Sequence, residues 1–365
     1  MKRILCIISS MNLGGAETFL MKVYRNIDRD NYQMDFCVVE KENYYASEIK
    51  ELGGRIFNIP LKSRHPFASL NAIRKIVRDN RFEYVIRINE HSLSTLDLLA
   101  AKFGGASRTI MRSSNAESGG GVSSLLHKCF WFMPRIIPDV KIAPSKLAAE
   151  YTFGKKMVKK GGVQIINNGL NLKQFEFDEN ERMNLRKQLK IEDKFVVGHV
   201  GRFSKQKNHE YLIDIFEEIK KKKNNAVLLL IGNGDLLVNI KQKVLEKGLG
   251  DSVVFMGLRN DVPKLLSTMD VFVFPSFYEG MPNTVIEAQT SGLPCVISDS
   301  ITSEAKVTEI VEEVSLSNPP SIWACKTLEL CGREKKKRIE YSKEMYIHGY
   351  DIKTVAKEFV ESIFG

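Results

Sequence analysis

Short apolar runs of strand character alternate with helical stretches along most of this chain. The strand-like runs, rich in β-branched and aromatic residues, are 3–9, 34–39, 55–59, 84–88, 107–111, 195–200, 226–231, 253–256, 271–274 and 295–297. Helical patterns such as 16–26, 45–52 and 67–79 stand between them. A strand followed by a helix and another strand is the repeating unit of a parallel sheet. We therefore expect an α/β protein whose helices cover parallel sheets.

The chain is long for one hydrophobic core and suits two domains. It has 365 residues, and a polar stretch at 178–186 separates the two series of strands. The tail from Tyr341 to Phe364 has a helical pattern. We predict a first domain over 1–177, a second over 178–345, and a C-terminal helical segment over 346–365.

Composition indicates an ordinary globular protein of a reducing compartment. Hydrophobic residues make up 43% and charged residues 27%. No apolar run reaches the length of a membrane span, and Met1-Lys-Arg leads directly into a strand pattern, so we expect neither a span nor a signal peptide. The cysteines are scattered: Cys6, Cys37, Cys129, Cys295, Cys325 and Cys331. Without metal-ligand spacing, they favour a cytoplasmic protein that carries no metal.

The net charge of +10 has two interpretations. Basic runs at 155–160, 220–223 and 335–338 are typical of solvated helix faces. They are also compatible with attraction to an anionic membrane or to a phosphate-bearing acceptor. Nucleic acid is disfavoured, because these runs lack interleaved aromatic residues and no nucleic-acid-binding motif is present.

The segment 274–294 is the most informative for function. It sets two carboxylates, Glu279 and Glu287, across the junction between a loop and a helix. Pro282 suits the first helical turn, but no Ser, Thr, Asp or Asn precedes it as a side-chain cap. The helix would therefore present unbonded backbone N–H groups and a positive dipole end, which suit a phosphate. The carboxylates could hold sugar hydroxyls at two places on one elongated ligand.

This segment resembles the E-x7-E motif of the retaining glycosyltransferases of family 4, which have the GT-B fold of two Rossmann-like domains facing across a cleft. Further matching segments are Gly14-Gly15 after the first strand, Asn168-Gly169 before Phe175, Gly201-Arg202-Phe203 with Lys205 and Lys207, Ile231-Gly232-Asn-Gly234, and Phe255-Met-Gly257 with Arg259 and Asp261. They occur in order over roughly residues 3–310, most of the chain. The enzymes that build bacterial exopolysaccharide and capsule repeats are the most similar in character.

The resemblance implies an acceptor-binding first domain, a donor-binding second domain, and a last helix that crosses back to the first. It implies that Glu279 orients donor-sugar hydroxyls and that Glu287 holds the ribose. A glycosidase-like nucleophilic role for Glu279 is the alternative. The implied donor-binding set is Gly14, Gly15, Gly257, Arg259, Met281, Asn283, Thr284, Val285 and Glu287.

Arg202 and Lys207 are the cations expected to assist the chemistry. They follow a strand end at Val200, and ligands of parallel α/β sheets collect at such ends. Departure of a nucleoside diphosphate develops negative charge that fixed cations stabilise. Both could instead be surface cations, which is the simpler interpretation for Lys205.

The loop 112–117 departs from many relatives, which carry a histidine there. Met111 and Arg112 occupy the neighbourhood, so Arg112, Asn115 or the nearby His91 is expected to contact the sugar or the acceptor. The apolar stretch 125–137 follows three glycines; it would pack in a core or enter a lipid interface.

We therefore predict a metal-independent retaining glycosyltransferase with no cofactor. It would move a sugar from a nucleoside diphosphate donor, expected to be UDP-linked, to a lipid-linked glycan at the cytoplasmic membrane face. A GT-B-type sugar-nucleotide epimerase and a catalytically silent sugar-nucleotide binder remain as alternatives. A nicotinamide dehydrogenase is disfavoured, since Gly232-Asn-Gly234 lacks the third glycine, and Asp28-Arg-Asp30 lies at a helix end where it would not hold a metal.

Overall fold

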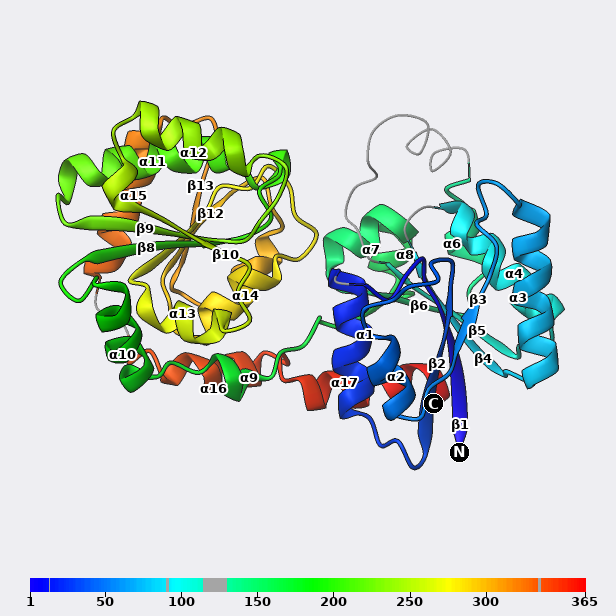
Figure 1. Ribbon diagram of the computed structural model, residues 1–365. Helices are drawn as coiled ribbons and strands as arrows, with labels where there is room; N and C mark the ends of the chain where they lie inside the picture. Colours follow the sequence, from blue (N-terminus) through cyan, green and yellow to red (C-terminus); the bar gives the residue numbers. More distant parts are fainter. Residues whose placement is uncertain (13, 90–91, 114–129, 334–335) are drawn as a thin grey trace. The chain divides into compact units, whose positions relative to one another are not determined.

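The computed structural model describes residues 1–12, 14–89, 92–113, 130–333 and 336–365 (Figure 1). These residues form two compact units. Unit 1 comprises residues 1–170 and 350–365, and unit 2 comprises residues 171–349. Each unit contains one parallel sheet with helices on its faces, as the alternation of strands and helices predicts.

The sheet of unit 1 has seven strands in the order β3-β2-β1-β4-β5-β6-β7, and all neighbouring pairs are parallel. The strands are β1 (Lys2–Ile7), β2 (Tyr32–Val38), β3 (Ile56–Asn58), β4 (Tyr84–Asn89), β5 (Arg108–Ser113), β6 (Val140–Ala143) and β7 (Gln164–Ile165). The helices are α1 (Gly15–Asn26), α2 (Ala46–Glu51), α3 (Pro66–Asn80), α4 (Leu96–Phe103), α6 (Met133–Ile136), α7 (Lys146–Phe153), α8 (Lys155–Lys159) and α17 (Ile352–Phe364).

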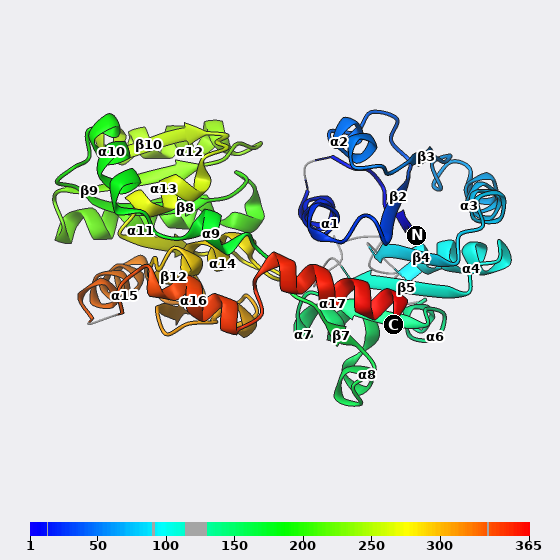
Figure 2. The same cartoon turned by 90° about the horizontal axis from the view of Figure 1, so that it is seen from below.

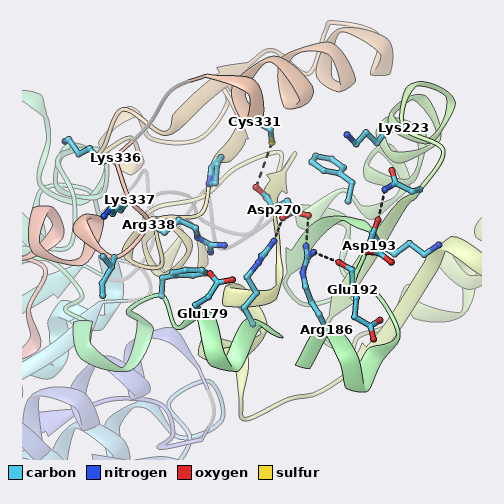
Figure 3. Close-up of a pocket in the computed structure, with 18 residues that line it drawn as sticks. Glu179, Arg186, Glu192, Asp193, Lys223, Asp270, Cys331, Lys336, Lys337 and Arg338 are labelled. Carbon is cyan, nitrogen blue, oxygen red and sulfur yellow. Dashed lines mark hydrogen bonds and ion pairs between the residues drawn. The ribbon is translucent and has the colours of Figure 1, made fainter. Parts of the chain in front are cut away.

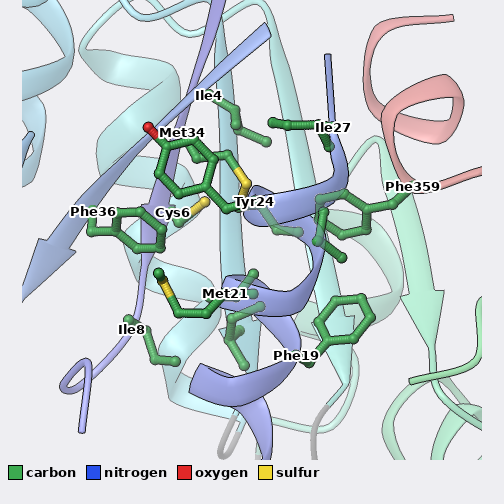
Figure 4. Close-up of a cluster of buried hydrophobic side chains, with 14 of the residues drawn as sticks. Ile4, Cys6, Ile8, Phe19, Met21, Tyr24, Ile27, Met34, Phe36 and Phe359 are labelled. Carbon is green, nitrogen blue, oxygen red and sulfur yellow. The ribbon is translucent and has the colours of Figure 1, made fainter. Parts of the chain in front are cut away.

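Strand β1 is buried on both faces of its sheet. Ile4 and Cys6 belong to one hydrophobic cluster, which also includes residues of α1 and α17 (Figure 4). Leu5 and Ile7 belong to a second cluster with residues of α3, α4 and α7. Successive side chains of a strand point to opposite faces, so the continuous apolar run of β1 requires helices on both sides.

The C-terminal helix α17 packs in unit 1, as expected. Its Phe359 lies edge-on to Phe19 of α1, with ring centroids 5.6 Å apart, and Figures 1 and 2 both show red α17 beside blue α1. The helical tail is not continuous, however. Helix α16 (Glu340–Ile347) ends before Gly349, whose φ of 75° lies in the left-handed region, and the Asp351 side chain caps α17 by accepting from the N–H groups of Lys353 and Thr354.

The sheet of unit 2 has six parallel strands in the order β10-β9-β8-β11-β12-β13. They are β8 (Phe195–Val200), β9 (Ala226–Ile231), β10 (Val253–Gly257), β11 (Val271–Phe274), β12 (Cys295–Ser298) and β13 (Val311–Val314). The remaining helices of the unit are α9 (Leu172–Phe175), α10 (Glu179–Leu189), α11 (His209–Lys222), α12 (Leu237–Glu246), α13 (Val262–Thr268), α14 (Asn283–Thr290) and α15 (Pro320–Gly332). Figure 1 shows α11, α12 and α15 on one face of this sheet and α13 and α14 on the other.

Both sheets reverse their strand order once. In unit 1 the order runs outward from β1 on one side and from β4 on the other, and in unit 2 it does so from β8 and β11. At such a switch point the two following loops diverge to opposite faces of the sheet and leave a crevice at the carboxyl ends of the strands, where α/β proteins bind ligands. The topology therefore directs the search for a site to the loops after β8 and β11.

Two details bear on interpretations that the sequence left open. Arg338, expected on a solvated basic face, points inward and donates to the backbone carbonyls of Leu266 and Met269. Trp131, Phe132 and Ile136 are 48%, 45% and 74% exposed, so this part of the apolar stretch is not core. In the part of the chain that the structure describes, none of the helices has both the length and the apolar character needed to cross a membrane.

Candidate functional site

The switch point of unit 2 brings together a cation and a carboxylate that the sequence singles out. Lys207 ends the short helix η2 (Lys205–Lys207) in the loop after β8, and Glu279 lies in the loop between β11 and α14. The Lys207 Nζ donates to Glu279 Oε1 over 2.6 Å. Their side chains are only 17% and 10% exposed, so the pair is partly shielded from water. Charges in such a place interact more strongly than they do on an open surface.

Backbone contacts hold the two loops together. The N–H of Phe277 donates to the carbonyl of Gln206 over 2.9 Å. The Gln206 side-chain amide donates in return to the carbonyl of Tyr278, also over 2.9 Å. These bonds join Gln206, the residue before Lys207, to the two residues before Glu279. The ion pair is therefore fixed by its backbone as well as by its own attraction.

Aromatic rings form the base beneath the Lys207 ammonium. The Nζ lies 4.6 Å from the centroid of the Phe274 ring, within the range of a cation–π interaction. On that ring stacks the imidazole of His199 from β8, with centroids 5.4 Å apart and planes inclined by 22°. His209, the first residue of α11, lies edge-on to His199 at 4.7 Å and stacks on Phe203 at 4.1 Å.

Both histidines are neutral at ordinary pH. Burial, His209 and Lys207 hold the pKa of His199 well below its usual range, and burial together with Lys207 lowers the pKa of His209 to about 4. The His199 Nδ1 lies 2.9 Å from the carbonyl oxygen of Val273, which can only accept, so Nδ1 carries the proton. His199 Nε2 and both His209 nitrogens are buried without a hydrogen-bond partner among the described residues. The two histidines therefore lie close to Lys207 and are not placed to act as an acid–base pair.

Helix α14 begins without a side-chain cap, as the sequence predicts, but Pro282 precedes its first turn and does not lie within it. Pro282 is its N-cap residue and no side chain caps it. The N–H of Val285 already donates to the carbonyl of Pro282 over 3.0 Å, whereas the Thr284 hydroxyl is buried with no partner among the described residues. Glu287 lies further along α14 and is partly exposed. The amino end of α14 thus adjoins the loop that carries Glu279.

The other predicted donor-side residues are more exposed. The Arg202 side chain is 70% exposed and reaches Asp235 at 3.5 Å, so it is a loosely held cation of the same loop as Lys207. Arg259 makes a two-pronged pair with Asp261, with N–O distances of 2.8 and 2.6 Å. Gly257 ends β10, and Met281 lies partly buried just before α14.

A close backbone approach explains the glycine motif after β9. Gly232 has a φ of 139°, and a Cβ placed on it would lie 2.1 Å from the carbonyl oxygen of Gly201. Its N–H donates to the carbonyl of Gly257 over 2.8 Å. The ends of β8, β9 and β10 are therefore packed backbone to backbone, which fixes the base of the loop that carries Arg202 and Lys207.

In unit 1 the predicted contacts fall into three groups. Gly14 and Gly15 begin α1 without a side-chain cap, and the Glu17 carboxylate lies against Gly14. Arg112 is only 1% exposed; it donates to Asn168 Oδ1 over 2.7 Å and lies 3.6 Å from the Phe19 ring centroid, and burial lowers its pKa to about 9. His91 and Asn115 lie outside the described residues.

A separate hollow of about 970 Å³ lies at the other edge of the unit 2 sheet (Figure 3). Its lining includes Phe195, Asp270 and Pro294, which stand at the amino ends of β8, β11 and β12. The guanidinium of Arg186 already donates to Asp270 over 2.7 Å, and that of Arg338 donates to backbone carbonyls. This hollow lies at the amino ends of the strands, whereas ligands of parallel α/β sheets bind at the carboxyl ends, so the switch point is the stronger candidate for ligand binding. Among the described residues, no group of three or more histidine, cysteine or acidic side chains is placed to hold a metal ion.

Sequence reasoning named Lys207 and Glu279 but missed the residues that fix them. Gln206 carries no signal in the sequence. Phe274 is visible there only as the end of a buried strand, and nothing in the sequence singles out His209. His199 falls within the predicted strand 195–200, and the structure stacks its ring on Phe274.

Comparison with known proteins places the chain among glycosyltransferases. Residues 181–313, which hold both Lys207 and Glu279, match the family described as glycosyl transferases group 1. The putative glycosyltransferase EpsF of Bacillus subtilis is 31% identical over 359 residues, which cover 96% of this chain and 93% of that protein. An Escherichia coli protein named UDP-Gal:alpha-D-GlcNAc-diphosphoundecaprenol alpha-1,3-galactosyltransferase is 27% identical over 74% of this chain and 72% of its own length.

A solved structure shares the fold. The crystal structure of Anabaena HepE in complex with UDP has a TM-score of 0.81 and 18% identity, and the match covers 99% of each chain. The expected class of two parallel-sheet, Rossmann-like domains of the GT-B type is thereby confirmed. EpsF is 31% identical to this chain over nearly the full length of both proteins, so the chain belongs to the glycosyl transferases of group 1.

Proposed function

We propose that this protein is a retaining, metal-independent glycosyltransferase that uses a UDP-sugar as donor and a lipid-linked glycan as acceptor. It would act at the cytoplasmic face of the membrane in the assembly of a bacterial surface polysaccharide. The observation that carries the proposal is the Lys207–Glu279 pair at the switch point of unit 2, beside the uncapped start of α14.

The chemistry follows from the charges at this point. When the bond between sugar and diphosphate breaks, negative charge develops on the departing phosphate, and a fixed ammonium stabilises that charge more than the ground state. Lys207 is the fixed cation, and the exposed Arg202 is a second cation that the ligand would order. Glu279 would orient hydroxyls of the donor sugar while the acceptor attacks from the side that the phosphate leaves.

The rest of the donor would lie along α14 and the neighbouring strand ends. Glu287 would accept from the ribose hydroxyls, and Asn283, Thr284 and Val285 would face the diphosphate with their backbone and the Thr284 hydroxyl. Gly257 and Arg259 would border the base, and Met281 would pack near the sugar. In unit 1, Gly14 and Gly15 belong to the proposed donor-binding set, and Arg112, Asn115 and His91 would contact the sugar or the acceptor.

The choice of donor and acceptor rests on the comparisons and on the resemblance. HepE has been crystallised with UDP, and the E. coli relative is named for transfer of galactose from UDP to a sugar on diphosphoundecaprenol. These are properties of those proteins, and they make a UDP-sugar and a polyprenyl-diphosphate glycan the first substrates to try.

A peripheral membrane contact would suit such an acceptor. Trp131, Phe132 and Ile136 are exposed around α6, and Lys155 and Lys156 are exposed at the start of α8. The Arg135 guanidinium links these parts, because it lies 3.7 Å from the Trp131 ring centroid and against Gly154. Exposed aromatic residues next to lysines are typical of surfaces that enter an anionic lipid interface.

The test is sugar transfer from a panel of UDP-sugars to lipid-linked acceptors, with and without a metal chelator. We expect transfer with retained anomeric configuration, read by NMR of the product. Lys207→Ala should lower kcat/KM by about 100-fold to 1,000-fold, the order seen when a group that stabilises transition-state charge is removed. The matched control is Lys264→Ala, which removes a lysine that pairs with Glu181 on the surface of the same unit at 2.8 Å.

Each alternative has its own outcome in this assay. Release of an isomerised nucleotide sugar without transfer would indicate the epimerase, and binding without turnover would indicate the silent binder. Full activity of Lys207→Ala would refute the assigned role of the cation, and loss of transfer on chelation would refute metal independence.

A further inference from the structure

Lys207 and Glu279 satisfy each other while the site holds no ligand. The carboxylate is 10% exposed, and among the described residues Lys207 is its sole hydrogen-bonding partner. An unpaired, partly buried charge is costly, because it has lost part of its hydration without gaining a partner. Any ligand that draws the Lys207 ammonium away therefore leaves Glu279 in need of a new partner.

A whole donor and a bare nucleotide differ in what they can offer Glu279. Both present a diphosphate to Lys207. The donor also carries sugar hydroxyls, which can donate to the released carboxylate. A nucleoside diphosphate without its sugar takes the ammonium and gives Glu279 nothing in return, so the carboxylate competes with the diphosphate for Lys207.

The loops keep this competition in place. The reciprocal bonds of Gln206 with Phe277 and Tyr278 hold Glu279 within reach of Lys207, and the Phe274 ring fixes the ammonium from below. These bonds hold the two loops together independently of the ion pair. The ion pair should therefore re-form whenever the ligand leaves.

We propose that Glu279 is a specificity-determining residue that favours the sugar-bearing donor over the sugar-free nucleoside diphosphate, by re-forming its ion pair with Lys207 when the sugar is gone. The pair acts as an internal competitor of the product and assists its release. The proposal rests on the proposed function and goes beyond the contact with sugar hydroxyls assigned to Glu279 there.

The direct test is the binding of UDP, measured by calorimetry in the absence of acceptor. Glu279→Gln keeps the size of the side chain but removes the competing charge, so the variant should bind UDP about tenfold more tightly than the wild type, within the range of coupling between contacting groups. Its affinity for the active UDP-sugar should not rise in parallel. The preference for donor over UDP should therefore fall by about the same factor.

A double-mutant cycle isolates the pair. Lys207→Met should weaken UDP binding, and Glu279→Gln should have no further effect in that background, because nothing is left to compete for. Glu181→Gln is the matched control: it removes the same charge from the Glu181–Lys264 pair of unit 2, and it should leave the UDP affinity unchanged. Glu279→Asp provides a second variant, since a shorter side chain weakens the pair while keeping its charge and should also tighten UDP binding.

Three results would overturn the inference. UDP affinity that is unchanged or weaker in folded Glu279→Gln would show that the carboxylate does not compete for Lys207. An equal gain in the Lys207→Met background would show a general effect of charge. Failure of the wild type to bind UDP would overturn the proposed function and this inference together, whereas the first two results would leave the proposed function intact.

Discussion

At the level of single residues, the two charges of the site could be predicted and their surroundings could not. Lys207 and Glu279 each follow the end of a strand-like run, and polar residues at such ends meet when the strands are parallel and adjacent. Whether the Lys207 and Glu279 side chains bond directly depends on how the two irregular loops that carry them pack together. Gln206 holds the two loops together, because its side-chain amide donates to the backbone carbonyl of Tyr278. No sequence pattern predicts this hydrogen bond.

The buried histidine His209 predicts a dependence of stability on pH. Its pKa falls from 6.5 to about 4 on folding, so the unfolded chain binds a proton between these values and the folded chain does not. Stability that is present above pH 6.5 is therefore lost as the pH falls toward 4, by about 3 kcal/mol in all. His209→Phe keeps a ring stacked on Phe203 but removes this titration. The variant should lose about 2 kcal/mol less unfolding free energy than the wild type between pH 7 and pH 5.

The measurement is urea unfolding at the two pH values, followed by fluorescence. The chain has two tryptophans, so in a Trp131→Phe background the buried Trp323 reports the unfolding of unit 2 alone. The exposed His348, changed to Phe, is the matched control for the replacement of a histidine by phenylalanine. A His209→Phe protein that loses as much stability as the wild type on acidification would contradict the assignment.

At the level of elements, close backbone packing after β9 fixes the ends of β8, β9 and β10. In Gly232→Ala the new Cβ would meet the Gly201 carbonyl oxygen at 2.1 Å, and alanine would have to adopt a φ of 139°. We expect a loss of several kcal/mol in unfolding free energy, of the size seen when packing and backbone strain combine. Thermal unfolding measures it. Gly250→Ala is the control, because its Cβ would meet nothing closer than 3.6 Å; equal melting temperatures for the two variants would refute the packing argument.

The contact between α17 and α1 predicts a second loss of stability. Phe359 is 1% exposed and packs edge-on against Phe19, so Phe359→Ala should cost about 3 to 5 kcal/mol through lost burial and the cavity left behind. Lys357→Ala alters the exposed side of the same helix, where the lysine is 78% exposed, and should stay within about 0.5 kcal/mol. Circular dichroism during urea unfolding compares the two. Similar midpoints would mean that α17 contributes little to the core of unit 1.

The strands that the sequence predicts and those that it misses differ in physical character. The strand β9, Ala226–Ile231, is an unbroken apolar run buried at every position, and its predicted bounds are the observed ones. The missed strands are short or mixed. Strand β7 has two residues, both exposed, and β13 places Glu312 and Glu313 between two valines. These segments form strands because they pair with the edge of an existing sheet, and not because of their local sequence pattern.

At the level of the whole molecule, the two units are not equivalent in sequence. Unit 2 is one continuous segment, residues 171–349, with its own hydrophobic cluster around Phe216, Leu228 and Trp323. Unit 1 is discontinuous, because residues 350–365 complete the core that residues 1–170 begin. At the return point Leu170 donates to the carbonyl of Tyr350 and accepts from the N–H of Ile352, so the outgoing and returning segments are bonded to each other.

This asymmetry predicts different behaviour for the isolated pieces. Residues 171–349 should fold alone, with cooperative unfolding and protection from proteolysis, because no part of their hydrophobic cluster comes from outside the segment. Residues 1–170 should not, since they would expose the side chains that α17 covers, among them Phe19. Adding residues 350–365 back through a flexible linker should restore folding, and the same addition carrying Phe359→Ala should restore it less well. If residues 1–170 alone unfold as cooperatively as the linked form, residues 350–365 are not needed for the stability of the unit 1 core.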